Sequence, residues 1–258
     1  MLTHVVDREC ALSGGGTISA HLSFALLALL FFKDREGLFK AAWHWWGLLI
    51  VFFLGIAFSL TRGEWISIAV ISIVYGWLFN RKLLFITVLI AVICAVSIPD
   101  VRNRLKTLAS PLENSSDRIT LWKNAASHGT DHPILGYGPE TFHVIFNNWG
   151  KMGDPYVGSW HNDFIQLYME SGIVGVLGWL GVIGSFAYAS FKVLVSGVEH
   201  LRKVGWMGIV LIIAYLITGF FSIPTFSITN AMLFRFILAI VAVEYSGMKI
   251  SLQRAQTA

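Results

Sequence analysis

Residues 64–98 read EWISIAVISIVYGWLFNRKLLFITVLIAVICAVSI, and this stretch decides the fold. Its only charged residues are Glu64 at the start and Arg81 with Lys82, which separate two apolar runs. A run of about 17 to 25 apolar residues is long enough to cross the hydrocarbon core of a bilayer as a helix. We therefore expect residues 64–80 and 83–98 to form two membrane-spanning helices joined by a short basic turn.

The same pattern recurs along the whole chain. Of the 258 residues 55% are hydrophobic and only 13% are charged, roughly half the charged share of an average soluble domain. The mean hydropathy is +0.67. Further apolar runs lie at 18–32, 45–61, 173–194, 206–222 and 229–245. The composition predicts an all-α integral membrane protein with about seven transmembrane helices and one large hydrophilic loop.

Basic residues predict the orientation of these helices, because loops rich in Lys and Arg stay in the cytoplasm. They occupy alternate connections and the C-terminus: Lys33, Arg35, Lys40, Arg81, Lys82, Lys192, Arg202, Lys203, Lys249 and Arg254. The long loop then faces outward, away from the cytoplasm. This divides the chain into an extracytoplasmic segment (1–17), four helices (18–98), an outward-facing loop (99–172), three helices (173–245) and a cytoplasmic tail (246–258). Because residues 14–17 resemble an interhelical loop, we expect the chain to be the C-terminal part of a longer protein.

The outward-facing loop is predicted to contain short helices. Ser115-Ser116-Asp117 is a good helix N-cap cluster, which favours a helix to about Ser127. Gly136 and Gly138 permit a tight turn, a second short helix is expected within 141–147, and residues 160–171 favour an amphipathic helix. Glycines recur every third position from 172 to 184, a spacing typical of close helix packing in lipid.

Three residues of the predicted outer side are candidates for chemistry. Arg62 lies between two apolar runs, where charges are expensive and usually functional; it could instead anchor the hairpin or pair with Glu64. Arg118 could pair with Asp117 at a helix start. His161 begins the helix that returns the chain to the membrane, and it could be structural.

Aromatic residues of the loop have their own interpretation. Trp122 and Trp160 are more typical of interfacial anchors than of sugar platforms.

The loop motifs, taken in order, resemble the O-antigen ligase and polymerase family. They are Arg118 with Trp122, Pro133 with Gly136 and Gly138, His161-Asn162, Leu167 with Glu170, Gly172 and Gly175, and the upstream Thr61-Arg62-Gly63. The resemblance covers roughly residues 17 to 245, and it implies that the loop 99–172 is a periplasmic catalytic loop. Members of the family usually carry several more N-terminal spans than this chain has.

The resemblance implies transfer of a glycan from an undecaprenyl-pyrophosphate carrier to an acceptor hydroxyl at the periplasmic face of the bacterial inner membrane. In the ligases the acceptor is the lipid A core, and the product is lipopolysaccharide. Arg62 and Arg118 would stabilise the leaving pyrophosphate, since a guanidinium binds phosphate oxygens in pairs. His161 would be the general base. Tyr137, Asn162 and Arg235 are expected to bind substrate.

Several other kinds of chemistry are not expected. His128 and His132 have the spacing of a helical zinc pair, but Gly129 and Pro133 argue against a helix there, so we expect neither a metal nor a cofactor. No nucleotide-binding glycine loop or Walker motif occurs. The net charge of +4 and the pI of about 9.1 reflect the cytoplasmic loops, so membrane lipids rather than nucleic acid are the expected partners.

Alternatives remain within and outside this reading. A polysaccharide polymerase or a protein O-oligosaccharyltransferase would share the arginine and histidine chemistry but use another acceptor. A non-catalytic transporter of lipid-linked glycans would carry charges along several spans. Nearly all charges here cluster at one face; Arg235 is the exception, and it could line a carrier-lipid groove or pair with Glu244.

Overall fold

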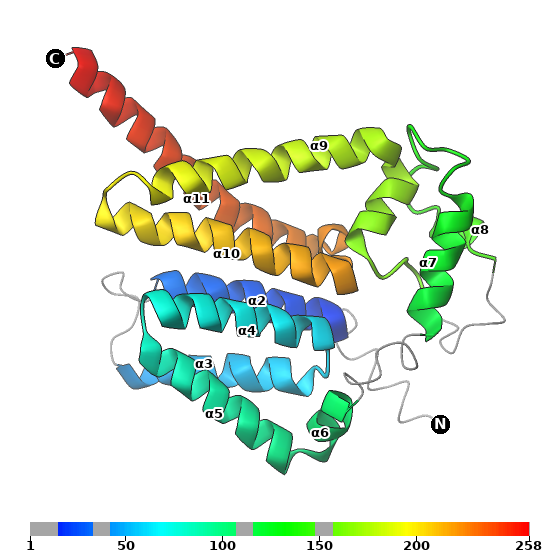
Figure 1. Cartoon of the computed structure of the whole chain (residues 1–258), viewed down its shortest axis with the longest axis horizontal. Coiled ribbons are helices and arrows are strands. Elements are labelled where there is room, and N and C mark those ends of the chain that lie inside the picture. The colour runs from blue at the N-terminus through cyan, green and yellow to red at the C-terminus, as the bar shows by residue number, and fades with distance from the viewer. Residues whose placement is uncertain (1–14, 33–41, 107–115, 148–156, 258) are drawn as a thin grey trace.

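The computed structural model describes residues 15–32, 42–106, 116–147 and 157–257, and every regular element in these ranges is a helix (Figure 1). The fold is therefore all-α, as the composition predicts. Residues 1–14, which make up most of the predicted N-terminal segment, lie outside the described part.

Each predicted span corresponds to one apolar helix. The helices are α2 (Gly15–Phe32), α3 (Ala42–Phe58), α4 (Arg62–Leu78), α5 (Arg81–Ser97), α9 (Asp163–Leu194), α10 (Glu199–Phe221) and α11 (Ile228–Thr257). By length and composition α9, α10 and α11 could each cross a membrane, whereas the apolar parts of α2, α3 and α4 are shorter. The chain is thus a membrane protein, and the count of seven spans stays a prediction.

Three short helices lie in the predicted loop: α6 (Pro99–Lys106), α7 (Ser116–His128) and α8 (Phe142–Ile145). Outside this loop, the 3-10 turn η3 (Pro224–Phe226) connects α10 to α11. The helices α7 and α8 lie where the sequence predicts them. The amphipathic helix begins three residues later than expected, at Asp163, because Asn162 caps it.

Two tight turns build the hairpins of α3 to α5. Leu60 adopts a left-handed φ of 53°, and the indole of Trp65 donates to the Ile56 carbonyl at 3.0 Å, which closes the end of α3. Between α4 and α5, the Asn80 side chain accepts from the Leu83 amide at 3.3 Å. Arg81 and Lys82 occupy the first turn of α5.

The helix α10 forms the centre of the bundle, because most of its surface is buried while α9 and α11 remain largely exposed. Its Tyr215 ring stacks on Phe234 of α11 with centroids 4.3 Å apart. A methyl group added at Gly205 would meet the α9 backbone at Leu194, 2.5 Å away. The close approach to α9 therefore uses glycines of α10.

The predicted close packing of the α9 glycine stripe is not seen at Gly178, Gly181 and Gly184, whereas Gly172 does meet a neighbour closely, with the Ile134 carbonyl carbon 2.3 Å from an added Cβ. A Cβ added at Gly178, Gly181 or Gly184 would meet no atom within 4 Å in the described structure. These glycines lie on the exposed side of α9. Periodicity in the sequence reveals that the residues share a face but not which neighbour that face meets.

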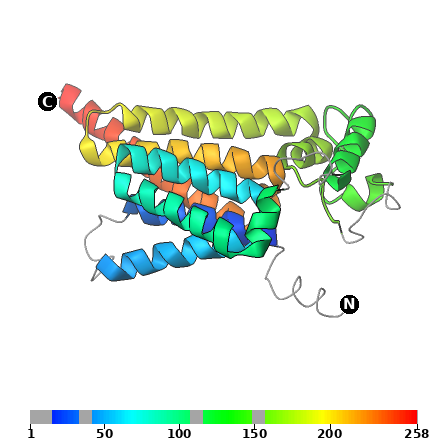
Figure 2. The ribbon, with the colours of Figure 1, turned by 60° about the horizontal axis from the view of Figure 1, so that its bottom comes forward.

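The helices place all predicted outer connections at one end of the bundle. Figures 1 and 2 show α6, α7, α8, η3 and the start of α9 gathered there, whereas the α4–α5 and α9–α10 turns lie at the other end. We call the first the loop end and the second the opposite end. This arrangement agrees with the alternation predicted from the basic residues.

Candidate functional site

The last turn of α10 is where the loop meets the bundle. The Arg118 side chain donates from Nη2 to the Phe221 carbonyl at 3.0 Å, and its guanidinium carbon lies 5.7 Å from the centre of the Phe221 ring. The Asn162 side chain donates to the neighbouring Phe220 carbonyl at 3.1 Å. The last carbonyls of a helix lack intrahelical partners, so these side chains satisfy groups that the helix leaves open.

The start of α4 reaches the same place. A Cβ added at Gly63 would lie 2.7 Å from Cβ of Phe221, so only a glycine allows this approach. The backbone of Arg62 therefore begins α4 beside the end of α10. The Arg62 side chain lies outside the described part of the structure, and its pairing with Glu64 stays untested. Glu64 itself is buried and accepts from the Thr218 hydroxyl at 3.3 Å.

His161 sits in a strained turn directly before α9. Its φ is 49°, a conformation uncommon in residues other than glycine although His is one of those enriched there. The preceding Trp160 receives a hydrogen bond on its carbonyl from the Trp122 indole at 3.2 Å, and its amide donates to Gln166 at 3.1 Å. After it, Asn162 caps α9 by accepting from the Phe164 and Ile165 amides at 3.0 and 3.1 Å.

A small aromatic core holds this turn. Trp160 is fully buried, and its ring meets Phe142 edge-on at 4.9 Å and Phe146 at 6.2 Å. Trp122 packs edge-on against Phe220 at 5.5 Å. The expectation that Trp160 is an interfacial anchor is wrong, because the loop folds around it.

The turn at Gly136 and Gly138, called the glycine turn below, forms hydrogen bonds with a break in α9. Gly172 has φ 61° and ψ −162°, which interrupts the helix, and Figure 1 shows the change of direction near its start. The broken segment and the glycine turn exchange backbone hydrogen bonds: Tyr137 amide to Met169 carbonyl at 2.8 Å, Gly138 to Glu170 at 3.0 Å, Ile173 to Pro133 at 2.9 Å and Val174 to Ile134 at 3.3 Å. The backbone groups that lose their helical partners at the break are thus paired with the glycine turn instead.

Tyr137 is part of the same construction. Its hydroxyl lies within hydrogen-bond distance of two acceptors, the His128 carbonyl at 3.0 Å and the Asp131 carboxylate at 2.9 Å, which share its single proton. Desolvation raises the pKa of the Tyr137 phenol above its usual value, and the hydrogen bond to Asp131 and the negative charge of Asp131 add to this effect. These contacts tie the glycine turn to the end of α7, and a contact with substrate stays a prediction.

Arg235 lies apart from these residues, on α11. It is exposed and lines a cavity of about 310 Å³ between α9, α10 and α11, together with Trp179, Tyr215, Thr225, Phe234 and Leu238. The structure describes no hydrogen bond or ion pair of Arg235, so it gives no support to the pairing with Glu244.

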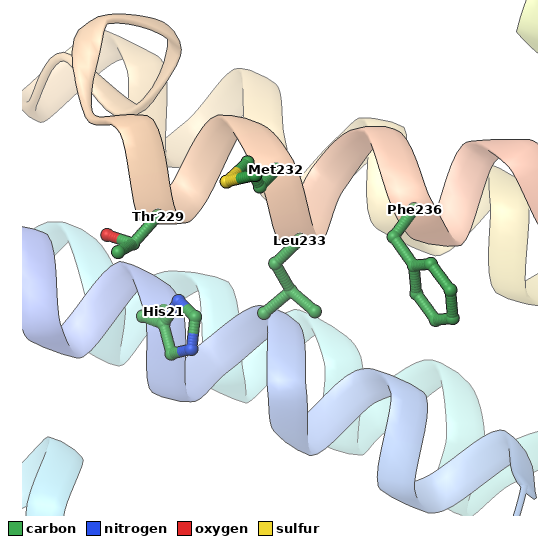
Figure 3. A pocket seen from close by; sticks show the side chains of 5 residues that line it. All are labelled: His21, Thr229, Met232, Leu233 and Phe236. Atoms are coloured by element: carbon green, nitrogen blue, oxygen red, sulfur yellow. The ribbon is translucent and has the colours of Figure 1, made fainter.

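A second, shallower groove lies on the other side of α11. Figure 3 shows His21 of α2 below Thr229, with Leu233 beside them and Met232 and Phe236 along the same helix; the groove measures about 350 Å³. Its lining is almost wholly apolar.

The sequence analysis missed Asp163. This residue is 3% exposed; its carboxylate accepts from the Tyr215 hydroxyl at 2.5 Å and from the Thr225 amide at 3.3 Å, and also binds the Thr225 hydroxyl. The only local signal is an acidic residue in the first turn of a helix, where it complements the helix dipole. Its partners are 52 and 62 residues away, so no local pattern could identify them.

Comparison with protein families gives one match. The family described as O-antigen ligase matches residues 47–180, just over half of the chain. The matched region includes Arg62, Arg118, Tyr137, His161 and Asn162, whereas Arg235 lies beyond it. A search of curated proteins found no match.

Proposed function

Since the chain belongs to the O-antigen ligase family, whose members are glycan-transferring enzymes, we propose that it transfers an undecaprenyl-pyrophosphate-linked glycan to a hydroxyl of the lipid A core. The reaction takes place at the periplasmic face of the bacterial inner membrane. The acceptor oxygen forms a bond to the anomeric carbon while the bond from that carbon to the pyrophosphate breaks.

One observation carries this proposal. Arg118 donates a hydrogen bond to the Phe221 carbonyl, and Asn162 of the His161-Asn162 turn donates to the neighbouring Phe220 carbonyl. Leaving-group stabilisation and proton removal must occur on opposite sides of one anomeric carbon. Because Asn162 directly follows His161, the residues proposed for both roles are attached to the same helix end.

Arg118 and Arg62 act on the leaving group in this mechanism. The departing pyrophosphate concentrates negative charge at the membrane surface, and a guanidinium stays protonated and binds two oxygens at once. Donors that are held in place before the reaction stabilise developing charge without reorganisation. The fixed bond of Arg118 to Phe221 supplies such an anchor.

His161 acts on the acceptor. A neutral imidazole accepts the hydroxyl proton as the new bond forms, a step worth roughly 10² to 10⁴ in rate. Asn162 and Tyr137 border this region and would contact the sugar or the pyrophosphate. The mechanism requires no metal ion, because the two arginines take the place of a cation at the pyrophosphate.

The cavity beside Arg235 fits the carrier lipid. Its apolar lining from α9 and α11 suits an isoprenoid chain, and an arginine seven residues into α11 lies roughly 10 Å below the loop end. A guanidinium at that depth can extend toward phosphate at the surface.

Reconstitution in lipid nanodiscs tests this function. The purified full chain is given an undecaprenyl-pyrophosphate-linked oligosaccharide with purified lipid A core, with no acceptor, or with a protein acceptor. We expect a product only with lipid A core, unaffected by EDTA. Chain elongation without acceptor would identify a polymerase, glycosylated protein an oligosaccharyltransferase, and carrier movement across vesicles without transfer a transporter. Inhibition by EDTA that zinc or magnesium reverses would contradict the metal-free mechanism.

A further inference from the structure

We propose that Asp163 is a positioning residue that fixes the turn between α10 and α11 against the His161 turn, and thereby sets where His161 stands at the end of α10. The inference rests on the proposed function for its kinetic consequence, but the positional part is independent of it. Asp163 does not touch the reacting atoms in this account.

The first step is the buried position of the carboxylate. It accepts hydrogen bonds from three groups, the Tyr215 hydroxyl, the Thr225 amide and the Thr225 hydroxyl, and the structure describes no cation bound to it. A buried charge is costly unless hydrogen bonds compensate for it. Here they come from α10 and from η3, so the charge is stable only while both segments stay in place.

The second step is the link to His161. Asn162 holds the Phe220 carbonyl and Asp163 holds Thr225, so the two residues after His161 bind either side of the Ser222–Ile223 connection. His161 itself has a left-handed φ of 49°. Such a conformation persists only where the surrounding structure over-determines it. The bonds of Asn162 and Asp163 to the α10–α11 connection are the restraints on the His161 backbone that the helix bundle supplies.

The third step is the close fit beneath Asp163. A Cβ added at Gly219 would lie 3.2 Å from Cβ of Asp163, so the helix end is shaped to receive this residue. Capping of α9 does not explain this close fit, because Asn162 already accepts hydrogen bonds from two amides at the start of that helix.

Distance measurement tests the positional part without any substrate. Both native cysteines are replaced with Ser, and spin labels are placed at Val144 of α8 and at Ile228 of α11, which are 85% and 78% exposed. Val144 reports on the core around Trp160, and Ile228 on the turn after α10. Thr225→Val and Asp163→Ala should broaden the distance distribution, whereas Thr225→Ser keeps the hydroxyl and should keep the distribution narrow. Thr87→Val, a matched control in α5, should change nothing.

Kinetics test the consequence in nanodiscs with the undecaprenyl-pyrophosphate oligosaccharide and lipid A core. Thr225→Val and Asp163→Asn should lower kcat about tenfold to a hundredfold, the scale of a 1 Å misplacement. The KM for the donor should be unchanged in Asp163→Asn; it is not used for Thr225→Val, because Thr225 also lines the cavity proposed for the carrier lipid. Thr225→Ser should restore kcat to within about twofold. A purely structural role would instead reduce the yield of folded protein and leave kcat per folded molecule normal.

Two results would overturn the proposal: an unchanged distance distribution in Asp163→Ala, or a broadened one with normal kcat. If the wild type transfers nothing to any acceptor while the distance arm behaves as expected, the proposed function fails and the link between the two turns stands.

Discussion

At the scale of single residues, Arg118 is the best-defined contact of the proposed site. A guanidinium offers five N–H donors, and the bond to the Phe221 carbonyl at 3.0 Å occupies one of them. The side chain is thus oriented by the protein, and its fork matches the geometry of phosphate oxygens. Lysine offers a compact charge without this fork.

We therefore expect Arg118→Lys to insert and fold normally but to lower the initial transfer rate roughly 10- to 100-fold. Arg62→Lys should behave in the same way. Initial rates per folded protein in nanodiscs measure this. The matched control is Arg202→Lys at the opposite end, where Arg202 pairs with Glu199 at 3.2 Å, and its rate should equal that of the wild type. Normal rates in both Lys variants would remove the phosphate role.

At the scale of elements, the glycine turn and the break in α9 depend on each other. Gly136 has φ 70°, and a Cβ there would lie 2.5 Å from the Glu170 carbonyl carbon. At Gly172, φ is 61° and a Cβ would overlap the backbone of Ile134. Each glycine allows the other segment to approach, so the four backbone hydrogen bonds between them form only with both present.

Gly136→Ala and Gly172→Ala should each lower the stability of the loop by about 1 to 3 kcal/mol from backbone strain alone, with overlap adding to this. The apparent melting temperature in detergent, followed by the monodisperse fraction after heating, should fall clearly below that of the wild type. Gly178→Ala is the control, since a Cβ there meets no atom within 4 Å. A fall in Gly178→Ala equal to that in Gly136→Ala would contradict the interdependence.

The sequence predicted the helices better than it predicted the contacts between them. The apolar runs predicted all seven long helices, and the cap at Ser116 and Asp117 predicted α7. The Phe220 and Phe221 carbonyls could not be foreseen as the meeting point, because they are apolar residues in the sequence and act through their backbone. Asp163 was missed for a related reason: its role depends on Thr225 and Tyr215, which only the packing of α9 on α10 brings near.

At the scale of the whole molecule, the account requires that the loop end faces the periplasm. Alternating basic connections predict this, and Figure 1 shows α7, α8 and the start of α9, which carry the loop candidates, at a single end of the bundle. A carrier lipid presented at that face would then meet the arginines, the His161 turn and the Arg235 cavity together.

Labelling with a membrane-impermeant thiol reagent tests the orientation. In a background without native cysteines, Val144→Cys reports on the loop end and Val195→Cys on the opposite end; the two positions are 85% and 57% exposed. In intact spheroplasts only Val144→Cys should react, and after lysis both should. Labelling of Val195→Cys alone in intact spheroplasts would reverse the predicted topology.

The transfer rate of a His161 variant tests the central claim most directly. Asn at this position suits the left-handed backbone but cannot take a proton at neutral pH, so His161→Asn separates chemistry from turn geometry. We expect transfer to lipid A core to fall roughly 10² to 10⁴-fold while binding of the undecaprenyl-pyrophosphate donor is retained. His143→Asn, an exposed histidine of the same loop, should transfer at the normal rate. Near-normal turnover in His161→Asn would contradict the account and leave His161 as part of the turn only.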